Sequence, residues 1–94
     1  MKELFWTPEA SDDRELIYTF IEADSPSAAL ALDELFSERA AYLVRHPGIG
    51  KPGQIPGTRE WVVHPRYVLV YDVVQTHVRV LRLLHTARAP VDRA

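Results

Sequence analysis

The stretch TREWVVHPRYVLVYDVVQTHVRVLRLLH, Thr58 to His85, contains three strand signals separated by short turn signals. Residues 58–64 and 67–74 alternate between two faces, whereas residues 77–84 are apolar on both, as in a central strand that is covered on both sides. Pro65 and the Gln75–Thr76 pair mark tight reversals. We therefore expect three consecutive antiparallel strands.

One short strand and two helices are predicted before this stretch. ELFW, residues 3–6, fits a strand. Thr7 followed by Pro8, and Asp24 or Ser25 followed by Pro26, are typical helix starts, because the side-chain oxygen caps free N–H groups and proline suits the first turn. The helices should end near residues 22 and 46 and form an antiparallel hairpin, since their connection is short. Their apolar stripes are Leu16, Ile17, Phe20 and Ile21 in the first helix, and Ala28, Leu32, Leu35, Phe36 and Leu43 in the second.

Residues 47–57, PGIGKPGQIPG, contain all four glycines of the chain and predict a crossover loop without a strand. Gly48 and Gly53 have the spacing of a phosphate-binding loop, but Gln54 stands where that motif needs lysine, so we reject nucleotide binding. The expected fold is α+β, in the order β-α-α-β-β-β, with the helical hairpin packed on a small, mainly antiparallel sheet.

Length and composition predict one soluble domain over residues 1–94. The chain is 47% hydrophobic and 26% charged, and it has no cysteine, which excludes disulfides and thiolate metal sites. No apolar run is long enough for a membrane span and no signal peptide is evident, so a cytoplasmic protein is expected. Residues 1–44 hold ten acidic and three basic side chains, and residues 45–94 hold three acidic and eight basic ones. The basic half is suited to an anionic partner.

The ends of the predicted strands place several cations at one edge of the sheet. His64 ends one strand, Arg66 and Tyr67 begin the next, and His85 ends the last, with Arg88 three residues on. Adjacent strands would put His64 and His85 about 10 Å apart. This rim allows three interpretations: general acid–base chemistry on a phosphodiester, binding of an acidic partner or nucleic-acid backbone, or a purely structural role. A metal site is disfavoured, because no carboxylate accompanies the histidines and their spacing is wrong.

Several other residues receive a structural or a binding interpretation. Trp61, Leu35 and Phe36 are expected in the core between sheet and hairpin, as are Tyr67 and Tyr71. Lys51 lies at the tip of the predicted loop. Arg59 and Arg82 fall within strands, where a charged side chain must reach a rim or a partner.

The block PGTREWVVHPRYVLVYDV, followed by VRVLRLLHTAR, resembles the RelE/ParE superfamily of bacterial type II toxins. The shared features are PG-x-RE-x-V entering one strand, Y-x-x-x-Y in the next and LH-x-x-R closing the last, together with the predicted element order. The resemblance covers nearly the whole chain. It implies a growth-inhibiting toxin that is neutralised by an antitoxin, without a cofactor.

The resemblance leaves two mechanisms open, and the departures from it distinguish them. The RelE-like branch cuts messenger RNA on the ribosome, whereas the ParE-like branch poisons DNA gyrase. Val68 stands where the nucleases have a strand arginine, only Arg88 matches a catalytic arginine position, and His85 fits the ParE-like pattern. We therefore expect a ParE-like gyrase inhibitor, with a ribosome-dependent endonuclease using His85 and Arg88 as the alternative. The residues expected to bind target or antitoxin are Lys51, Arg59, His64, Arg66, Arg82, His85 and Arg88.

Overall fold

The structure, a computed structural model, describes residues 2–88, and of Arg88 the backbone only. Strand β1, Glu3–Trp6, precedes helices α1, Pro8–Glu22, and α2, Pro26–Arg45. Four further strands follow, and the chain then forms a 3-10 turn, η1, over Thr86–Arg88. These strands are β2, Lys51–Pro52; β3, Thr58–His64; β4, Tyr67–Val73; and β5, His77–His85.

The sheet has the strand order β1-β5-β4-β3-β2, with β1 parallel to β5 and every other pair antiparallel. The α+β class and the consecutive antiparallel strands β3 to β5 are confirmed. The prediction of a strand-free loop was wrong, because Lys51 and Pro52 pair with Glu60 and Arg59 of β3. The four glycines and three prolines of residues 47–57 hid so short a strand from the sequence pattern.

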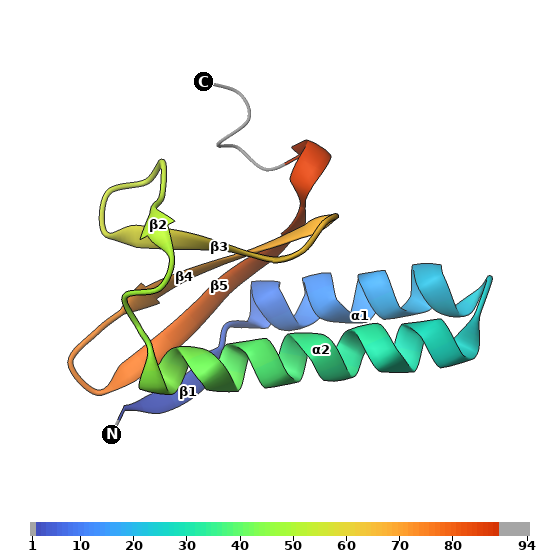
Figure 1. Ribbon diagram of the computed structural model, residues 1–94, viewed down its shortest axis with the longest axis horizontal. Helices are drawn as coiled ribbons and strands as arrows, with labels where there is room; N and C mark the ends of the chain where they lie inside the picture. The colour runs from blue at the N-terminus through green and yellow to red at the C-terminus, as the bar shows by residue number, and fades with distance from the viewer. Residues whose placement is uncertain (1, 89–94) are drawn as a thin grey trace.

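Both helices begin where the sequence predicts. The Thr7 hydroxyl accepts the Ala10 N–H at 3.1 Å, and the Ser25 hydroxyl accepts the Ala28 N–H at 3.2 Å, so Ser25 rather than Asp24 caps α2. The two helices run side by side under the sheet (Figure 1). Within residues 2–88, neither helix is long and apolar enough to cross a membrane.

The core lies between α2 and one face of the sheet. Phe36 and Leu43 of α2 are almost fully buried and belong to one core cluster with Leu69 and Tyr71 of β4. The expectation for Phe36 is thus confirmed, whereas Leu35 and Trp61 are only half-buried. The other buried members of this cluster are Ala10, Ala40, Val63, Tyr67, Val78, Val80 and Leu83.

Helix α1 lies along β5 beyond the point where β1 ends. The Thr7 N–H donates to the Val80 carbonyl at 3.0 Å, and Asp13 accepts the Leu83 N–H at 3.0 Å, so α1 satisfies part of the strand edge that β1 leaves uncovered. Leu16 and Phe20 belong to the apolar stripe that the sequence predicts for α1. They are 69% and 76% exposed, because only the Ile17 side of the wide apolar stripe faces inward.

Candidate functional site

Three rings meet where β3 and β5 flank the start of β4. Tyr67 is in register with His64 of β3 on one side and with His85 of β5 on the other. A register shift between Val62 and His64 brings His64 opposite Tyr67. The imidazole centroids lie 5.6 Å and 5.5 Å from that of the Tyr67 ring. The structure thus brings His64 and His85 to one edge of the sheet, separated by a single tyrosine.

The two histidines are oriented in the same way. Nδ1 of His64 accepts the Arg66 N–H at 3.0 Å, and Nδ1 of His85 accepts the Ala87 N–H at 3.2 Å. An imidazole that accepts at Nδ1 carries its proton at Nε2 when neutral. Over residues 2–88, neither Nε2 has a hydrogen-bond partner, so both rings retain a donor for a ligand.

A groove of about 590 Å³ opens between α1 and the end of β5, beside these rings. The exposed side chains of Leu16 and Phe20 line its α1 side, and Tyr67 and His85 line the opposite side. Arg66 stands at its rim and makes no ion pair within the described part of the chain. We call this site the Tyr67 groove. It brings together the apolar wall of α1, the half-buried His85 imidazole and the unpaired Arg66 guanidinium.

Arg82, a predicted binding residue, also lines the groove but already has a partner. Its guanidinium makes two hydrogen bonds to Asp13, at 2.7 and 3.0 Å. These bonds raise the pKa of Arg82 above its ordinary value, so it remains charged. Because Asp13 also accepts the Leu83 N–H, the pair fixes α1 against β5. We assign Arg82 a structural role.

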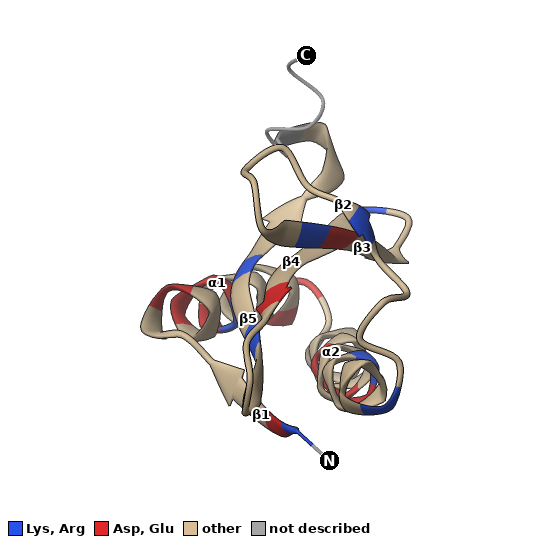
Figure 2. Cartoon of the chain, turned by 90° about the vertical axis from the view of Figure 1, so that its left-hand side faces the viewer, with Lys and Arg blue, Asp and Glu red and all other residues tan. Residues whose placement is uncertain are grey.

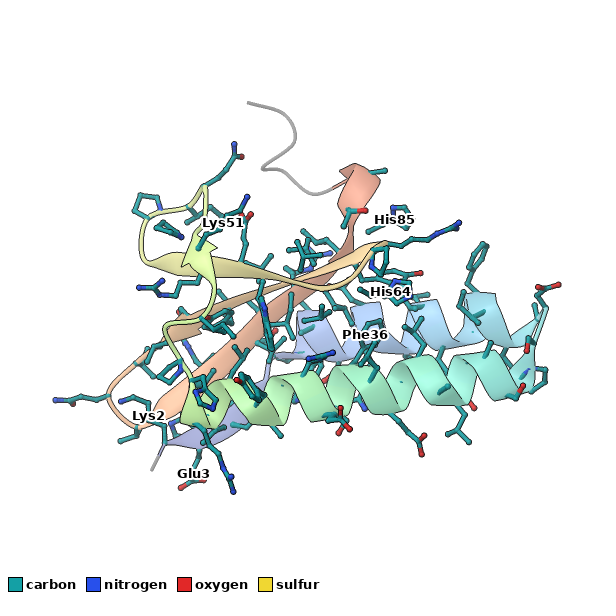
Figure 3. All side chains as sticks on the ribbon, viewed as in Figure 1. Lys2, Glu3, Phe36, Lys51, His64 and His85 are labelled. Atoms are coloured by element: carbon teal, nitrogen blue, oxygen red, sulfur yellow. The ribbon has the colours of Figure 1, made fainter. Side chains whose placement is uncertain are left out.

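Lys51 lies at the other end of the sheet from His64 and His85 (Figure 3). Arg59, near the start of β3, pairs with Pro52 beside it. Lys51 is exposed on β2, and Arg59 donates to the Gly50 carbonyl at 2.6 Å. The Tyr71 hydroxyl accepts the Gly50 N–H at 2.9 Å and donates to the Pro47 carbonyl at 2.8 Å. Burial raises the pKa of Tyr71, which keeps the hydroxyl protonated and able to donate. This end therefore anchors the loop over residues 47–57.

The seven residues predicted to bind target or antitoxin thus fall at two separate ends of the sheet. His64, Arg66 and His85 come together at the Tyr67 groove, whereas Lys51 and Arg59 do not join them. The side chain of Arg88 lies outside the described residues. Its backbone follows His85 directly in η1, which the Thr86 N–H fastens to the Arg66 carbonyl at 2.8 Å.

Sequence reasoning missed the contribution of α1 to this site. Leu16, Ile17, Phe20 and Ile21 form two adjacent apolar rows, which is wider than one packing face of a short helix requires. The excess width was the available signal for a second apolar contact. Asp13 carried no such signal, because its role depends on the register of β5 against α1.

The groove combines apolar side chains with a cationic rim. No group of three or more acidic or histidine side chains suitable for a metal ion occurs in the described residues 2–88. Val68 is buried and pairs with Val62 and Leu84, so the adjoining strand positions are apolar. An apolar groove with a cationic rim is typical of a protein-binding surface.

A helical hairpin packed on a five-stranded mixed sheet is the fold of a class of small bacterial toxins whose structures have been solved. The family model for the ParE toxin of type II toxin–antitoxin systems matches residues 4–90 of the sequence. The chain belongs to this family. It is therefore the toxin component of a type II toxin–antitoxin pair, and the family implies a cognate antitoxin as its partner.

Individual relatives agree with this assignment. The chain is 33% identical over 88 residues to Toxin RelE2 of Caulobacter vibrioides, covering 94% of this chain and 99% of the relative. A structure of the chromosomal ParDE system from P. aeruginosa superposes with a TM-score of 0.79 at 26% identity, over 90% of this chain and 96% of that one. A YoeB/ParE toxin from Agrobacterium tumefaciens shares the fold, with a TM-score of 0.63 at 19% identity, covering 88% and 96%.

Proposed function

We propose that this toxin arrests growth by binding DNA gyrase through the Tyr67 groove, and that its antitoxin covers the same groove. The observation that carries this proposal is the exposed apolar wall of Leu16 and Phe20 beside the unpaired cation of Arg66. Apolar anchors ringed by polar groups supply most of the binding free energy at protein interfaces.

The environment of Val68 supports binding over phosphodiester cleavage. Phosphoryl transfer needs cations placed where negative charge develops. Val68 and its partners Val62 and Leu84 offer none at that part of the sheet, and Arg82 is already occupied by Asp13. A toxin built in this way acts by occupying a surface of its target, in the cytoplasm where gyrase works.

The antitoxin is expected to present an apolar segment flanked by acidic side chains. Its apolar residues would bury Leu16 and Phe20, and its carboxylates would pair with Arg66 and with exposed Lys51. Phe20→Ser should weaken the complex at least tenfold without unfolding the toxin, since Phe20 is 76% exposed. Titration calorimetry with the antitoxin checks this; unchanged affinity would exclude the groove as its site.

The second candidate function is ribosome-dependent cleavage of messenger RNA. Two observations favour it: the fixed Nδ1 acceptor of His85, which leaves Nε2 available for acid–base work, and the 33% identity to a relative named Toxin RelE2. In this alternative Arg88 would stabilise the charge that develops on the phosphate.

A paired assay tests the two functions. The purified toxin is added to a gyrase supercoiling reaction and, separately, to translating ribosomes carrying a defined transcript. The proposal predicts inhibited supercoiling and an intact transcript. Specific transcript cuts by the parent toxin, abolished in His85→Ala at unchanged ribosome affinity, would establish the nuclease instead.

A further inference from the structure

A second surface, away from the Tyr67 groove, combines stacked rings with unpaired cations. The imidazole of His46, which caps α2, stacks on the Tyr42 ring with centroids 4.1 Å apart and an interplanar angle of 24°. The Tyr42 ring lies 5.6 Å from the indole of Trp61 on β3, at 30°. The Arg39 guanidinium sits 5.9 Å from the same indole. We call the surface formed by Arg39, Tyr42, Arg45, His46 and Trp61 the α2–β3 face.

The helix and the core explain why this column of rings is held in place. Residues 39, 42 and 46 recur at a spacing that puts them on one side of α2. Trp61 is half-buried and packs against the core, so it serves as a fixed base for the column. Tyr42 is 42% exposed and His46 is exposed, so the outer part of the column is open to a ligand.

The charge around the column is net positive. Residues 38–61 contain four basic side chains and two acidic ones, Glu38 and the buried Glu60. The ion pairs formed by residues 2–88 use Arg14, Arg79 and Arg82; Arg39, Arg45 and Lys51 enter none. In Figure 2, Lys and Arg lie on β2, β3, β5 and the near end of α2, whereas Asp and Glu are most frequent on α1 and also occur on α2 and β3.

We propose that the α2–β3 face binds a single-stranded segment of nucleic acid. The unpaired guanidinium groups of Arg39 and Arg45 would meet the phosphates, and a base would extend the ring column beyond His46. An acidic peptide would satisfy the cations but would leave the stacked rings without a use. This inference goes beyond the proposed function, because it concerns a different surface and neither gyrase nor antitoxin enters it.

Binding is measured by fluorescence anisotropy of a labelled oligothymidylate of about 12 nucleotides, within the usual range of single-strand site sizes. The full-length toxin is used at several salt concentrations. A Trp6→Phe variant leaves Trp61 as the sole tryptophan of the chain. The fluorescence of Trp61 should be quenched when a base joins the ring column. We expect a micromolar complex at low salt that weakens as salt rises.

The variants separate stacking from charge. Tyr42→Ala removes the ring on which His46 stacks, so the base loses its support, and binding should weaken about 5- to 100-fold, the usual effect of losing one stacked base. Tyr42→Phe keeps the ring and should keep most of the binding. Arg39→Ala and Arg45→Ala should each reduce the slope of log affinity against log salt by about 0.7. Glu38→Gln, one turn before Tyr42, removes a nearby negative charge and should strengthen binding. Arg66→Ala, at the other surface, is the matched control, and its oligonucleotide affinity and salt slope should equal those of the parent.

Several results would overturn the inference: no anisotropy change at low salt, Trp61 fluorescence that ignores the oligonucleotide, or equal losses from Arg66→Ala and Arg45→Ala. Duplex DNA that binds as tightly as the single strand, with Tyr42→Ala unaffected, would also contradict it. If circular dichroism shows that Tyr42→Ala does not fold, Arg45→Ala and Glu38→Gln still test the inference, because both side chains are exposed and, within residues 2–88, unpaired. Arg45→Ala should weaken oligonucleotide binding and Glu38→Gln should strengthen it.

Discussion

Two tyrosines on β4, four residues apart and on one face, mark the two ends of this toxin. Tyr71 is fully buried, and its hydroxyl both accepts from Gly50 and donates to Pro47. Tyr67 is 6% exposed, lies between His64 and His85, and its hydroxyl makes no hydrogen bond within residues 2–88. At the first end the tyrosine hydroxyl is fully used in holding a loop, whereas at the second the Arg66 guanidinium and the Nε2 groups of both histidines remain available to a partner.

The difference shows that the same residue type can have two roles on one strand: Tyr71 of β4 contributes to stability, and Tyr67 contributes to a binding surface. The Gly50 backbone approaches Tyr71 so closely that an added Cβ would lie 2.8 Å from the hydroxyl oxygen, so this end tolerates little change. Groups left unpaired around Tyr67 contribute less to stability and more to recognition.

The largest expected effect concerns the packing that supports Tyr67. The Phe36 ring meets the Tyr67 ring edge-on at 5.5 Å and is 1% exposed. Phe36→Ala should therefore cost about 3–5 kcal/mol of unfolding free energy. Leu35→Ala is the matched control, and we expect about 1–2 kcal/mol because Leu35 is half-buried. Equal losses in urea unfolding would mean that the core is not centred on Phe36.

Removing one hydroxyl from each end compares the two tyrosines directly. Tyr71→Phe leaves a buried N–H and a carbonyl without their partner, which should cost about 1–3 kcal/mol. Tyr67→Phe removes no hydrogen bond to the described residues and should change stability by less than about 0.5 kcal/mol. Thermal unfolding of both variants provides the test, and equal effects would remove the distinction between the two ends.

The pH dependence of stability should also originate at the Tyr71 end. Burial raises the pKa of Tyr71 above its ordinary value of 10.0, so the folded protein retains this proton where the unfolded chain has lost it. Its contribution is fully present below pH 10 and is lost as the pH rises toward the folded-state pKa. Stability of the parent should therefore fall above pH 10. Tyr71→Phe should show a shallower fall, and identical slopes would contradict this assignment.

The smallest expected change in stability is on the wall of the Tyr67 groove. Leu16→Ser should alter the unfolding free energy by no more than about 0.5 kcal/mol, because Leu16 is 69% exposed. Ile17→Ser, the next residue, packs against the core and should be clearly destabilising. If Leu16→Ser instead melts the protein, its side chain is part of the core and the groove has no apolar wall.

Sequence reasoning reached the fold because the decisive signals are local. Alternation in β3 and β4, the turn at Pro65 and the caps at Thr7 and Ser25 each depend on neighbouring residues. What it missed depends on contacts across the chain. The pairing of Lys51 with Glu60, the outward placement of Phe20 and the bond from Arg82 to Asp13 are set by tertiary register.

The candidate site was predicted in part for the same reason. His64, Arg66 and His85 could be placed together, since consecutive antiparallel strands bring their ends to one edge. Arg59 could not be distinguished from Arg66 by sequence, because only the structure supplies Arg59 with the Gly50 carbonyl.

The central claim is that the Tyr71 end stabilises the toxin and the Tyr67 end binds its target. The most direct test compares growth arrest by Arg66→Ala and Arg59→Ala at matched levels of folded protein. Arg66→Ala should lose growth arrest with an unchanged unfolding midpoint, because Arg66 has no ion pair within residues 2–88. Arg59→Ala should lower the midpoint, because it removes the bond to Gly50, and should retain full arrest per folded molecule. Full arrest by Arg66→Ala together with its loss in folded Arg59→Ala would contradict the account.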